Sequence, residues 1–540
     1  MYHCFMEKNK LLITINTNGK KIRLQAPKRR QLKGLLSDAG VQYVLPCGGL
    51  GRCGKCRVRF LSGVPDVNSL DKSFLTEKEI SDGFRLMCRC IITSDCEIVL
   101  DDMAFKEEEI EVKKIYKTRE HAPLDEKDIT GWGIAVDIGT TTLEAMLVGM
   151  NDEKTRQVFD IVSGINHQRK YGADVIARIS AAVGGDGEKL CQSIREDIKT
   201  LIVELVNGRA VNMLDYICIT GNTTMLHLLR GYDVAGLGEY PYKAVNLDVE
   251  NISARELLGD LSEKDFPYLS ETRAVLMPGI SAFVGADIVS GIDAISMTKM
   301  KHKALFVDLG TNGEMAYWDG HKLFVTSTAA GPVFEAGGIV CGTAAIPGAI
   351  YGVHIEEKDG KYKVELETIK NKEPSGICGS GVLEAVSELV RNRIVDETGI
   401  LTKEYFETGF PLTDGENGIR IYQSDIRNVQ LGKAAIAAAW SQLLGETDPE
   451  YIEISGGYSS SFDAKRIKYL KLLPQNSKIV LSASNAALVG CMYLLTDLLK
   501  SREAGDKAVK RLQKIAETAQ VVELVNKADF AEKYVEAMNF

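Results

Sequence analysis

Four cysteines in the first hundred residues have a spacing that could hold a metal cluster. Cys47, Cys53 and Cys56 share one glycine-rich loop, CGGLGRCGKC, and a fourth ligand, Cys88 or Cys90, comes later in RLMCRC. The glycines let the loop fold tightly and point backbone N–H groups at thiolate sulfur. Structural zinc sites, the alternative, usually pair two short C-x2-C knuckles, whereas three ligands share one loop here. The spacing therefore favours a [2Fe–2S] cluster over zinc.

The sequence around Cys88 resembles the long-loop ferredoxins of the adrenodoxin-like type, and the resemblance covers residues 9–101. In those ferredoxins the fourth ligand stands in an RL-x-C context, which this chain offers at Cys88. The resemblance implies that Cys90 and Cys96 are packed thiols. It implies that the cluster ligands are Cys47, Cys53, Cys56 and Cys88.

Secondary-structure signals around the loop describe a small α+β unit. LLITINTNGKKIRLQ alternates in polarity on either side of Asn18-Gly19, and this pattern predicts a hairpin. A helix is expected over residues 31–39, and strands are expected at RVRFL and CEIVL. We therefore predict a β-grasp, ferredoxin-like domain over residues 1–101, followed by a charged linker over residues 102–131.

Two similar turns later in the chain could bind phosphate. VDIGTTT at 136–142 and VDLGTNGE at 307–314 each bring an aspartate to the end of a hydrophobic strand, and a glycine turn follows. Backbone N–H groups at such turns bind phosphate, and the carboxylate can hold Mg²⁺ or orient a water. The predicted residues are Asp137, Gly139, Thr140, Thr141 and Thr142 in the first copy, and Asp308, Gly310, Thr311, Asn312 and Gly313 in the second.

The repeated strand–turn–strand pattern indicates two similar α/β domains that face each other across a cleft. It resembles the superfamily of acetate and sugar kinases, heat-shock chaperones and actin. That resemblance implies a multidomain α+β and α/β chain with two ribonuclease-H-like domains, over residues 132–300 and 301–540, that bind ATP with Mg²⁺. Asp137 and Asp308 are then the expected catalytic carboxylates.

Two further glycine clusters are candidate nucleotide contacts. EISGGYSS resembles the adenosine-side turn of the superfamily, and GICGSGVLEAV places small residues at a helix start, where anions bind readily. The candidates are Ser455, Gly456 and Gly457 in the first cluster, and Gly379, Ser380 and Gly381 in the second. Amphipathic helices are expected at 188–207, 379–392, 431–445 and 505–525.

Six other segments match no general motif. They are NHQRKYGADVIARI, ITGNTTMLHLLRG, MPGISAFVGADIVSG, AAGPVFEAGGIVCGTAAIPGAI, DIRNVQLGKAAI and SASNAALVG. Together with the ferredoxin unit, they resemble the ATP-dependent reductive activators of corrinoid proteins over nearly the whole chain. Longer members carry a further domain after the ferredoxin, where this chain has only residues 102–131, and some relatives carry C-terminal [4Fe–4S] motifs, whereas no cysteine follows Cys491 here.

The resemblance implies a one-electron reduction. In that family the cluster passes an electron to the Co(II) corrinoid of a methyl-transfer protein, ATP hydrolysis drives the transfer, and the product is Co(I). An upstream low-potential electron donor and a homodimer are also implied. The alternatives are an activator of another redox enzyme, a small-molecule kinase with a regulatory ferredoxin, and an ATP-switched binding protein like actin or a chaperone. Neither a kinase nor a chaperone explains the Cys47 loop.

Composition argues against other classes of partner. The chain has 540 residues, 65 basic and 74 acidic, with a formal charge of -9 and no long basic stripe, so nucleic acid is not an expected partner. The first residues, MYHCFMEKNK, do not form a signal peptide, and the longest apolar stretch is interrupted by polar residues. We therefore expect a soluble, cytoplasmic protein with no membrane partner. Twelve cysteines are too few for a disulfide scaffold.

Overall fold

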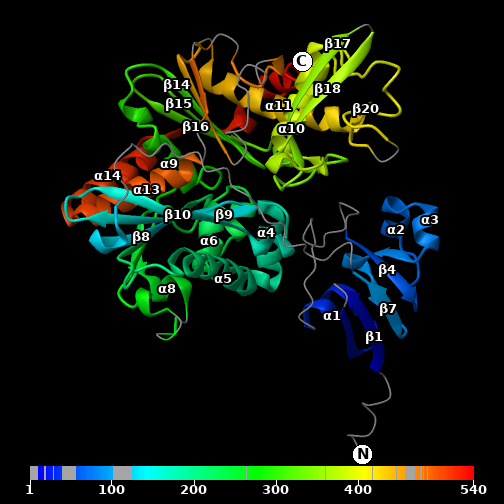
Figure 1. Cartoon of the computed structure of the whole chain (residues 1–540), viewed down its shortest axis with the longest axis horizontal. Helices are drawn as coiled ribbons and strands as arrows, with labels where there is room; N and C mark the ends of the chain where they lie inside the picture. The colour runs from blue at the N-terminus through cyan, green and yellow to red at the C-terminus, as the bar shows by residue number, and fades with distance from the viewer. Residues whose placement is uncertain are drawn as a thin grey trace, which may run out of the picture. The chain divides into compact units, whose positions relative to one another are not determined.

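The computed structural model of the chain is shown in Figure 1. It describes residues 10–17, 20–27, 29–38, 56–100, 124–259, 261–262, 264, 266–358, 360–415, 418–445, 447–456, 469–474, 477, 479–482 and 485–540. The chain divides into two compact units. The first comprises residues 1–108, 166–194 and 231–241, and the second comprises residues 109–165, 195–230 and 242–540.

The N-terminal part of the first unit is a five-stranded sheet with the order β2-β1-β7-β4-β5. β1 (Lys10–Thr17) and β2 (Lys20–Pro27) form the predicted hairpin, and β1 pairs in parallel with β7 (Cys96–Val99). β4 (Arg57–Ser62) lies between β7 and β5 (Phe84–Leu86). Together with helix α1 (Leu32–Asp38), these strands confirm the elements expected from the sequence.

A hydrophobic core holds this sheet against the segment that carries Cys88. Ile13, Ile15 and Leu32 are completely buried, and Cys88 itself is 1% exposed. Two short helices, α2 (Ser69–Phe74) and α3 (Glu77–Ser81), begin with capping boxes at Asn68 and Thr76. The unit therefore has its own core and its own helix starts, as an independent ferredoxin-like domain needs. Its further elements include the pair β3 (Arg30–Gln31) and β6 (Ile91–Ile92), α4 (Val175–Ala181), the π-helix Ala182–Asp186, the first part of α5 (Gly187–Val206), and α7 (Ala235–Gly238).

The second unit contains two six-stranded sheets that repeat one topology. The first has the order β10-β9-β8-β11-β13-β12 and the second β23-β22-β14-β15-β16-β24. In each sheet, three consecutive strands form an antiparallel meander, and parallel strands continue from its first member. The repeat expected from the two aspartate-containing segments is therefore present in the strand order as well.

The strand bounds place each aspartate at the end of the first strand of its meander. The first sheet consists of β8 (Ile129–Ile138), β9 (Thr142–Asn151), β10 (Arg156–Ile165), β11 (Tyr216–Gly221), β12 (Glu250–Ser253) and β13 (Arg273–Leu276). The second consists of β14 (Ala304–Leu309), β15 (Gly313–Trp318), β16 (Leu323–Thr328), β22 (Tyr451–Ser455), β23 (Ile479–Ser482) and β24 (Gln520–Val521). Residues 101–123, most of the predicted linker, lie outside the described residues, and β8 begins at Ile129, before the predicted boundary at 132.

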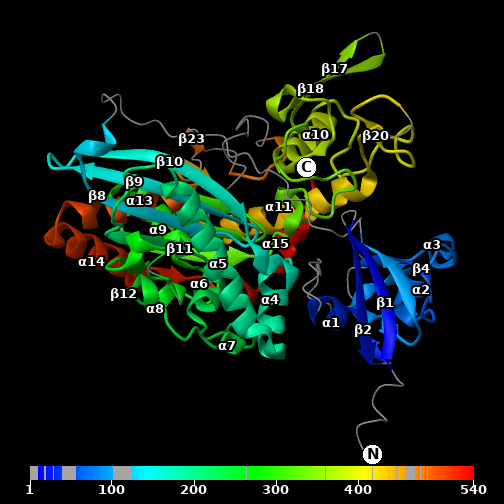
Figure 2. The ribbon, with the colours of Figure 1, turned by 60° about the horizontal axis from the view of Figure 1, so that its bottom comes forward.

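Helices α9 (Ala286–Ala294) and α13 (Ala486–Lys500) pack against each other, and α13 also lies on β8 and β11. Figure 2 shows this pair beside the first sheet. The helices approach closely because Gly490 has no side chain, and a Cβ there would lie 2.0 Å from the carbonyl oxygen of Ser290. The Ser290 hydroxyl donates a hydrogen bond of 2.6 Å to the carbonyl of Ala487. Since α13 follows β23 of the second sheet, it links the two halves of the unit.

The remaining helices are α6 (Thr223–Arg230), α8 (Ala254–Leu258), α10 (Gly379–Arg391), α11 (Gln423–Leu444), α14 (Arg502–Thr518) and α15 (Phe530–Glu536). Two predicted helices have different bounds. The helix expected at 431–445 begins at Gln423, because Asp425 accepts a 2.9 Å hydrogen bond from the Tyr422 N–H and caps an earlier start. The helix expected at 505–525 ends at Thr518, because Gln520–Val521 pair with β16 instead.

The small strands of the second half form a separate subsheet, β18-β17-β19, and a pair, β20-β21. They are β17 (Ala349–Lys358), β18 (Lys361–Thr368), β19 (Gly376–Ile377), β20 (Phe410–Pro411) and β21 (Arg420–Ile421). Buried glutamates of α10 bind β17: Glu384 accepts from the Val353 N–H at 3.0 Å, and Glu388 accepts from the Ile355 N–H at 2.7 Å. These bonds fix the middle and the C-terminal half of α10 relative to the subsheet.

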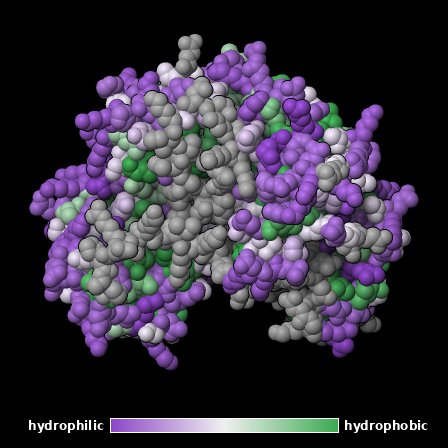
Figure 3. Space-filling view, turned by 45° about the horizontal axis from the view of Figure 1, so that its top comes forward, coloured by the Kyte–Doolittle hydropathy of each residue, from purple (hydrophilic) through white to green (hydrophobic). Residues whose placement is uncertain are grey.

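The surface view agrees with a highly charged composition. The face shown in Figure 3 is mostly hydrophilic, and hydrophobic residues appear on it in small separate groups. None of the helices in the described part of the chain combines the length and the hydrophobicity that a bilayer crossing requires.

Glu453, in β22, gives a pH-dependent prediction. Burial raises the pKa of its carboxyl to about 7, whereas the unfolded chain releases this proton near 4.5. The folded state therefore holds a proton that the unfolded state loses, so the contribution of Glu453 to stability falls as pH rises from 4.5 to 7. We expect Glu453→Gln to raise the free energy of unfolding at pH 8 by about 1 to 2 kcal/mol and to change it little at pH 4.5.

Thermal or urea unfolding of the variant and the wild type at both pH values checks this expectation. Glu517→Gln, at an exposed position of α14, is the matched control and should change neither value. A Glu453→Gln protein that is less stable than wild type at pH 8 would show that the carboxylate is paired and charged in the folded state.

Candidate functional site

The first predicted phosphate turn joins β8 to β9. The Gly139 N–H donates to the carbonyl of Thr142 at 2.9 Å, which closes the turn. A Cβ on Gly139 would lie 2.7 Å from the same carbonyl oxygen, so the tight closure requires glycine. Asp137 stands opposite Glu144 in the strand register, just before the turn.

The second turn joins β14 to β15 and repeats this arrangement. The Gly310 N–H donates to the carbonyl of Asn312 at 3.0 Å, and Asp308 stands opposite Glu314 in the register. Gly313 lies close to α11, because a Cβ there would lie 2.0 Å from the Cδ1 atom of Ile436. Each hairpin therefore presents an aspartate and a glutamate side by side, and neither Glu144 nor Glu314 was expected from the sequence.

Five carboxylates of the two halves influence one another in this region. Burial raises the pKa of Asp137 to about 7, and the charges of Asp287 and Glu144 add to the effect. Burial and the charge of Asp137 raise the pKa of Asp308 to about 7. Burial and the charge of Asp308 do the same for Asp287, in the first turn of α9. Burial, with the charges of Asp287 and Asp308, raises the pKa of Glu314 well above its usual value.

Such a concentration of carboxylates is suited to a divalent cation. Among the described residues, no three histidine, cysteine, aspartate or glutamate side chains converge closely enough to hold a metal by themselves. Mg²⁺ commonly takes only one or two carboxylates and completes its shell with water and substrate phosphate oxygens. The residues present therefore fit Mg²⁺ that arrives with a nucleotide better than a resident metal ion.

Asn485 and Ser455 position the two predicted catalytic aspartates. The Asn485 amide donates to Asp137 at 2.7 Å and to Glu144 at 2.6 Å, and its oxygen caps the start of α13 by accepting from the Leu488 N–H at 2.8 Å. Ser455 hydrogen bonds with Asp308 and accepts from the Ala486 N–H at 3.1 Å. The start of α13 therefore binds Asp137 directly through Asn485 and is connected to Asp308 through Ser455 of β22.

Two more side chains contact the threonines of the turns. The Asn222 amide donates to the Thr140 hydroxyl at 3.2 Å. The Glu335 carboxylate accepts from the Thr141 hydroxyl at 3.2 Å and from the Thr311 hydroxyl at 3.0 Å. The two turns therefore meet at one carboxylate.

The other predicted nucleotide residues have different surroundings. Gly456 follows β22 with a φ of 118°, and a Cβ there would lie 2.3 Å from the carbonyl oxygen of Leu309, so this position requires glycine. A Cβ on Gly379 would lie 1.7 Å from the carbonyl oxygen of Phe334, and Ser380 is 2% exposed. The start of α10 is therefore packed tightly inside the protein. Gly457 lies outside the described residues.

In the ferredoxin unit, the structure describes two of the four predicted cluster ligands. The thiols of Cys56 and Cys88 hydrogen bond to each other, and this contact together with burial raises the pKa of Cys56. The Met87 N–H donates to the carbonyl of Cys56 at 2.7 Å, which ties the two segments together. Two thiols in contact within a glycine-rich sequence fit a shared cluster. Cys47 and Cys53 lie outside the described residues.

Several of these site residues were missed by sequence reasoning, although a signal existed for some. Asn222, Asp287, Glu335 and Asn485 all lie in segments that resemble the activator family, but the resemblance assigned them no role. Glu144 and Glu314 both lie opposite the aspartate of their hairpin, but the first turn is one residue longer than the second, so a position-by-position comparison of the two motifs does not align them.

Three family models match successive parts of the chain. The 2Fe-2S iron-sulfur cluster binding domain matches residues 15–93, and the RACo middle region matches residues 132–300. The C-terminal domain of RACo, the ASKHA domain, matches residues 302–540. The two RACo models together cover well over half of the chain.

Individual relatives agree with these models. "Corrinoid activation enzyme RamQ" from Eubacterium limosum is 29% identical over 456 residues, which are 76% of this chain and 71% of the relative. "[Co(II) methylated amine-specific corrinoid protein] reductase" from Methanosarcina barkeri is 25% identical over 415 residues, 71% of this chain and 73% of the relative. The solved structure of a "Reductive activator for corrinoid,iron-sulfur protein" matches with 25% identity and a TM-score of 0.64, over 98% of both chains. The chain therefore belongs to the family of ATP-dependent reductive activators of corrinoid proteins, with an N-terminal ferredoxin domain and an actin-like ATPase.

Proposed function

We propose that this chain reduces the cobalt of a corrinoid methyl-transfer protein from Co(II) to Co(I), one electron at a time, at the expense of ATP. The observation that carries the proposal is the presence on one chain of a thiol pair, Cys56 and Cys88, and of two phosphate turns that meet at a cluster of carboxylates. The relatives named above are an activation enzyme and a reductase of corrinoid proteins, which supports the same partner here.

The iron–sulfur part of the proposal assigns the ligands Cys47, Cys53, Cys56 and Cys88. A [2Fe–2S] cluster supplies one-electron chemistry, with ferredoxin potentials near about -400 mV. Contact between the Cys56 and Cys88 thiols supports Cys88 as the fourth ligand. Cys90 is instead influenced by the charges of Asp71 and Cys96.

The nucleotide part assigns roles to the two turns. Asp137 and Asp308 hold Mg²⁺ or orient a water, and the turn residues Thr140 to Thr142 and Thr311 to Gly313 bind the phosphates. Ser455 to Gly457 lie on the adenosine side. The start of α10, at Gly379 and Ser380, packs against the Phe334 carbonyl next to the site. Asn485 donates to both Asp137 and Glu144, which favours their charged forms and opposes the effect of burial on their pKa values.

ATP is needed because the electron transfer is unfavourable. Within this family the Co(II)/Co(I) couple lies below the cluster potential, and each deficit of about 59 mV costs a factor of ten in a one-electron equilibrium. Movement of the two halves around bound nucleotide changes the contacts with the corrinoid protein and so shifts that equilibrium. An upstream low-potential donor, a homodimer and a cytoplasmic location are further parts of this proposal.

The proposal is tested by mixing the reduced holoprotein with candidate Co(II) corrinoid proteins and Mg-ATP, and by following the absorption band of Co(I). We expect Co(I) to form with at least one partner, to require ATP, and to disappear in Cys53→Ala. Absence of Co(I) with every partner, or Co(I) formation that Cys53→Ala leaves unchanged, would refute the assignment. Turnover of a phosphorylated small molecule without any effect of corrinoid protein would favour a kinase.

A further inference from the structure

Glu335 is a carboxylate to which neither the turn motifs nor the family resemblance assigns a role. It is the last residue of the short 3-10 helix Pro332–Glu335. Its Oε2 atom accepts from the hydroxyls of Thr141 and Thr311, at 3.2 and 3.0 Å. These threonines belong to hairpins of two different sheets, so Glu335 lies where the two proposed phosphate-binding turns come together.

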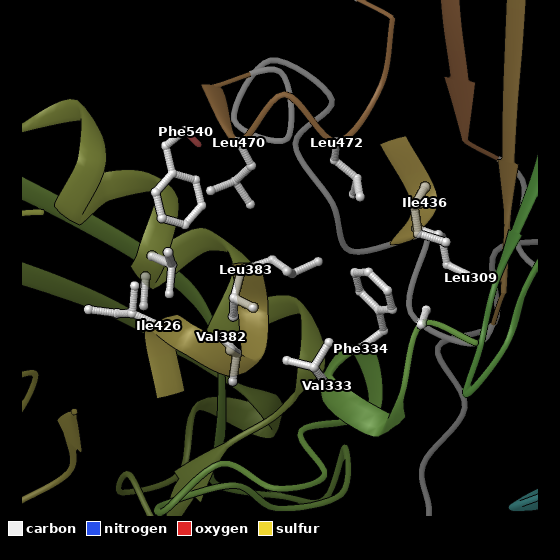
Figure 4. Packing of buried hydrophobic residues seen from close by; sticks show 14 of the residues in the cluster. Leu309, Val333, Phe334, Val382, Leu383, Ile426, Ile436, Leu470, Leu472 and Phe540 are labelled. Atoms are coloured by element: carbon white, nitrogen blue, oxygen red, sulfur yellow. The ribbon is translucent and has the colours of Figure 1, made fainter. Parts of the chain in front are cut away.

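The backbone beside Glu335 is held firmly by the core. Val333 and Phe334 are 3% and 1% exposed, and they pack in the cluster that contains Leu309 and Ile436. Figure 4 shows their side chains directed into this cluster. Leu309 directly precedes the second turn. Gly379, at the start of α10, packs closely against the carbonyl of Phe334. The position of Glu335 relative to the second turn is therefore fixed by packing.

Glu335 contacts a threonine of each turn. Burial raises the pKa values of Asp137, Asp287, Asp308 and Glu314, and the charges of neighbouring carboxylates add to the effect, which is the arrangement expected where a cation binds. Glu335 accepts hydrogen bonds from two neutral hydroxyls that are themselves proposed phosphate contacts. It therefore lies beside the hydroxyls that are proposed to bind phosphate, where it can take part in proton transfer.

The binding of nucleotide would change the hydrogen bonds of this carboxylate. A threonine hydroxyl has a single proton, so a hydroxyl that donates to a phosphate oxygen no longer donates to Glu335. The distance from the carboxylate to the phosphate oxygens is then the length of two hydrogen bonds, roughly 5 to 6 Å. This distance leaves room for one water between them. Its vacated lone pairs can accept a proton from that water.

We propose that Glu335 orients and deprotonates the water that attacks the terminal phosphate of ATP, an inference that rests on the proposed function of the two turns. The water oxygen forms a bond to phosphorus, and the bond from that phosphorus to the bridging oxygen of ADP breaks. The proton lost by the water passes to the Glu335 carboxylate and from there to the released phosphate. Asp137 and Asp308 then have the separate role of binding the metal ion. When phosphate accepts the hydrogen bonds of Thr141 and Thr311, these hydroxyls stop donating to Glu335, which can then act as the base.

Glu335→Gln separates this role from a purely structural one. The Gln amide oxygen can still accept from both hydroxyls, so the connection between the turns is kept, but a neutral amide cannot take a proton. In the cluster-loaded full chain, we expect kcat for Mg-ATP hydrolysis to fall by about 10² to 10⁴ and the Kd for Mg-ATP to change by less than about threefold. Glu335→Asp, which keeps a carboxylate, should hydrolyse ATP faster than Glu335→Gln.

The matched control is Glu503→Gln, at an exposed position of α14 where the carboxylate contacts Lys507 at 2.6 Å. It should behave as wild type in both measurements, and the thermal unfolding curves of all variants should show a folded protein. Glu335→Gln with wild-type hydrolysis, or with affinity lost as strongly as rate, would overturn the proposal. So would an Asp variant no faster than Gln. If Glu335→Gln lost hydrolysis while wild type hydrolysed ATP but produced no Co(I) with any corrinoid protein, the corrinoid assignment would fail and the role of Glu335 would stand.

Discussion

Cys88→Ala is expected to abolish the iron–sulfur cluster, and with it all ATP-dependent formation of Co(I). Alanine removes one of four thiolates, and a [2Fe–2S] cluster with three protein ligands is readily lost. The matched variant Cys90→Ala should keep the cluster; Cys90 directly follows the 3-10 helix Met87–Arg89 that contains Cys88. Iron content per chain and the electron paramagnetic resonance signal of the reduced protein measure the difference.

The structure explains why two neighbouring cysteines should behave so differently. Cys88 contacts the Cys56 thiol, and the Cys56 and Met87 backbones are hydrogen bonded at 2.7 Å. The buried carboxylate of Asp71 accepts from the Leu86 N–H at 2.9 Å and holds the start of this segment. Cys90 is buried in the same core, but burial and the charges of Asp71 and Cys96, not contact with Cys56, raise the pKa of its thiol to about 12. Iron lost from Cys90→Ala and kept in Cys88→Ala would reverse the assignment of the fourth ligand.

Local signals were sufficient to predict most of the ferredoxin unit. The predicted hairpin, helix and two strands are present, because each depends on alternation and turn chemistry within a few residues. The parallel pairing of β1 with β7 could not be read in this way, since it joins residues such as Ile13 and Cys96 that are far apart in sequence. Only the resemblance to ferredoxins connected them.

The ATPase site shows the same division between local and distant information. Asp137 and Asp308 were found because each ends an apolar strand before a glycine turn. Asn485, which binds Asp137, is 348 positions away, and Glu335, which binds Thr141, is 194 positions away. No periodicity or spacing rule relates residues at such separations, so these partners became visible only when the two sheets were assembled.

The two repeated hairpins share an acidic pair that their turn motifs do not predict. Although the two turns differ by one residue in length, an acidic residue in the second strand of each hairpin lies opposite the aspartate in the first. Two Asp–Glu pairs then meet near Asp287, and the mutual repulsion of these side chains must be balanced by a cation when nucleotide binds. The folded protein is therefore least stable when this site is empty. Binding of nucleotide with its cation should raise the free energy of unfolding.

Asp308→Asn is therefore expected to change function and stability in opposite directions. Asparagine keeps the shape of the side chain but removes one charge from the cluster, so repulsion with Asp137 and Glu314 falls and the nucleotide-free protein becomes more stable. The same change removes a charge that the metal needs, and we expect ATP hydrolysis and ATP-dependent Co(I) formation to fall by about 10² to 10³. Thermal unfolding with and without Mg-ATP, together with steady-state hydrolysis, measures both effects.

The opposite signs distinguish a metal-binding carboxylate from a structural one. A structural aspartate that lost its partners would lower the unfolding midpoint of the nucleotide-free protein, whereas relief of repulsion raises it. The stabilisation by Mg-ATP should shrink in Asp308→Asn, because the ligand binds the variant less tightly. Asp506→Asn, on the exposed face of α14, should leave hydrolysis, Co(I) formation and both midpoints at their wild-type values. If Asp308→Asn kept wild-type hydrolysis and lost stability, Asp308 would be part of the scaffold, and the metal would have to be held by other carboxylates of the cluster.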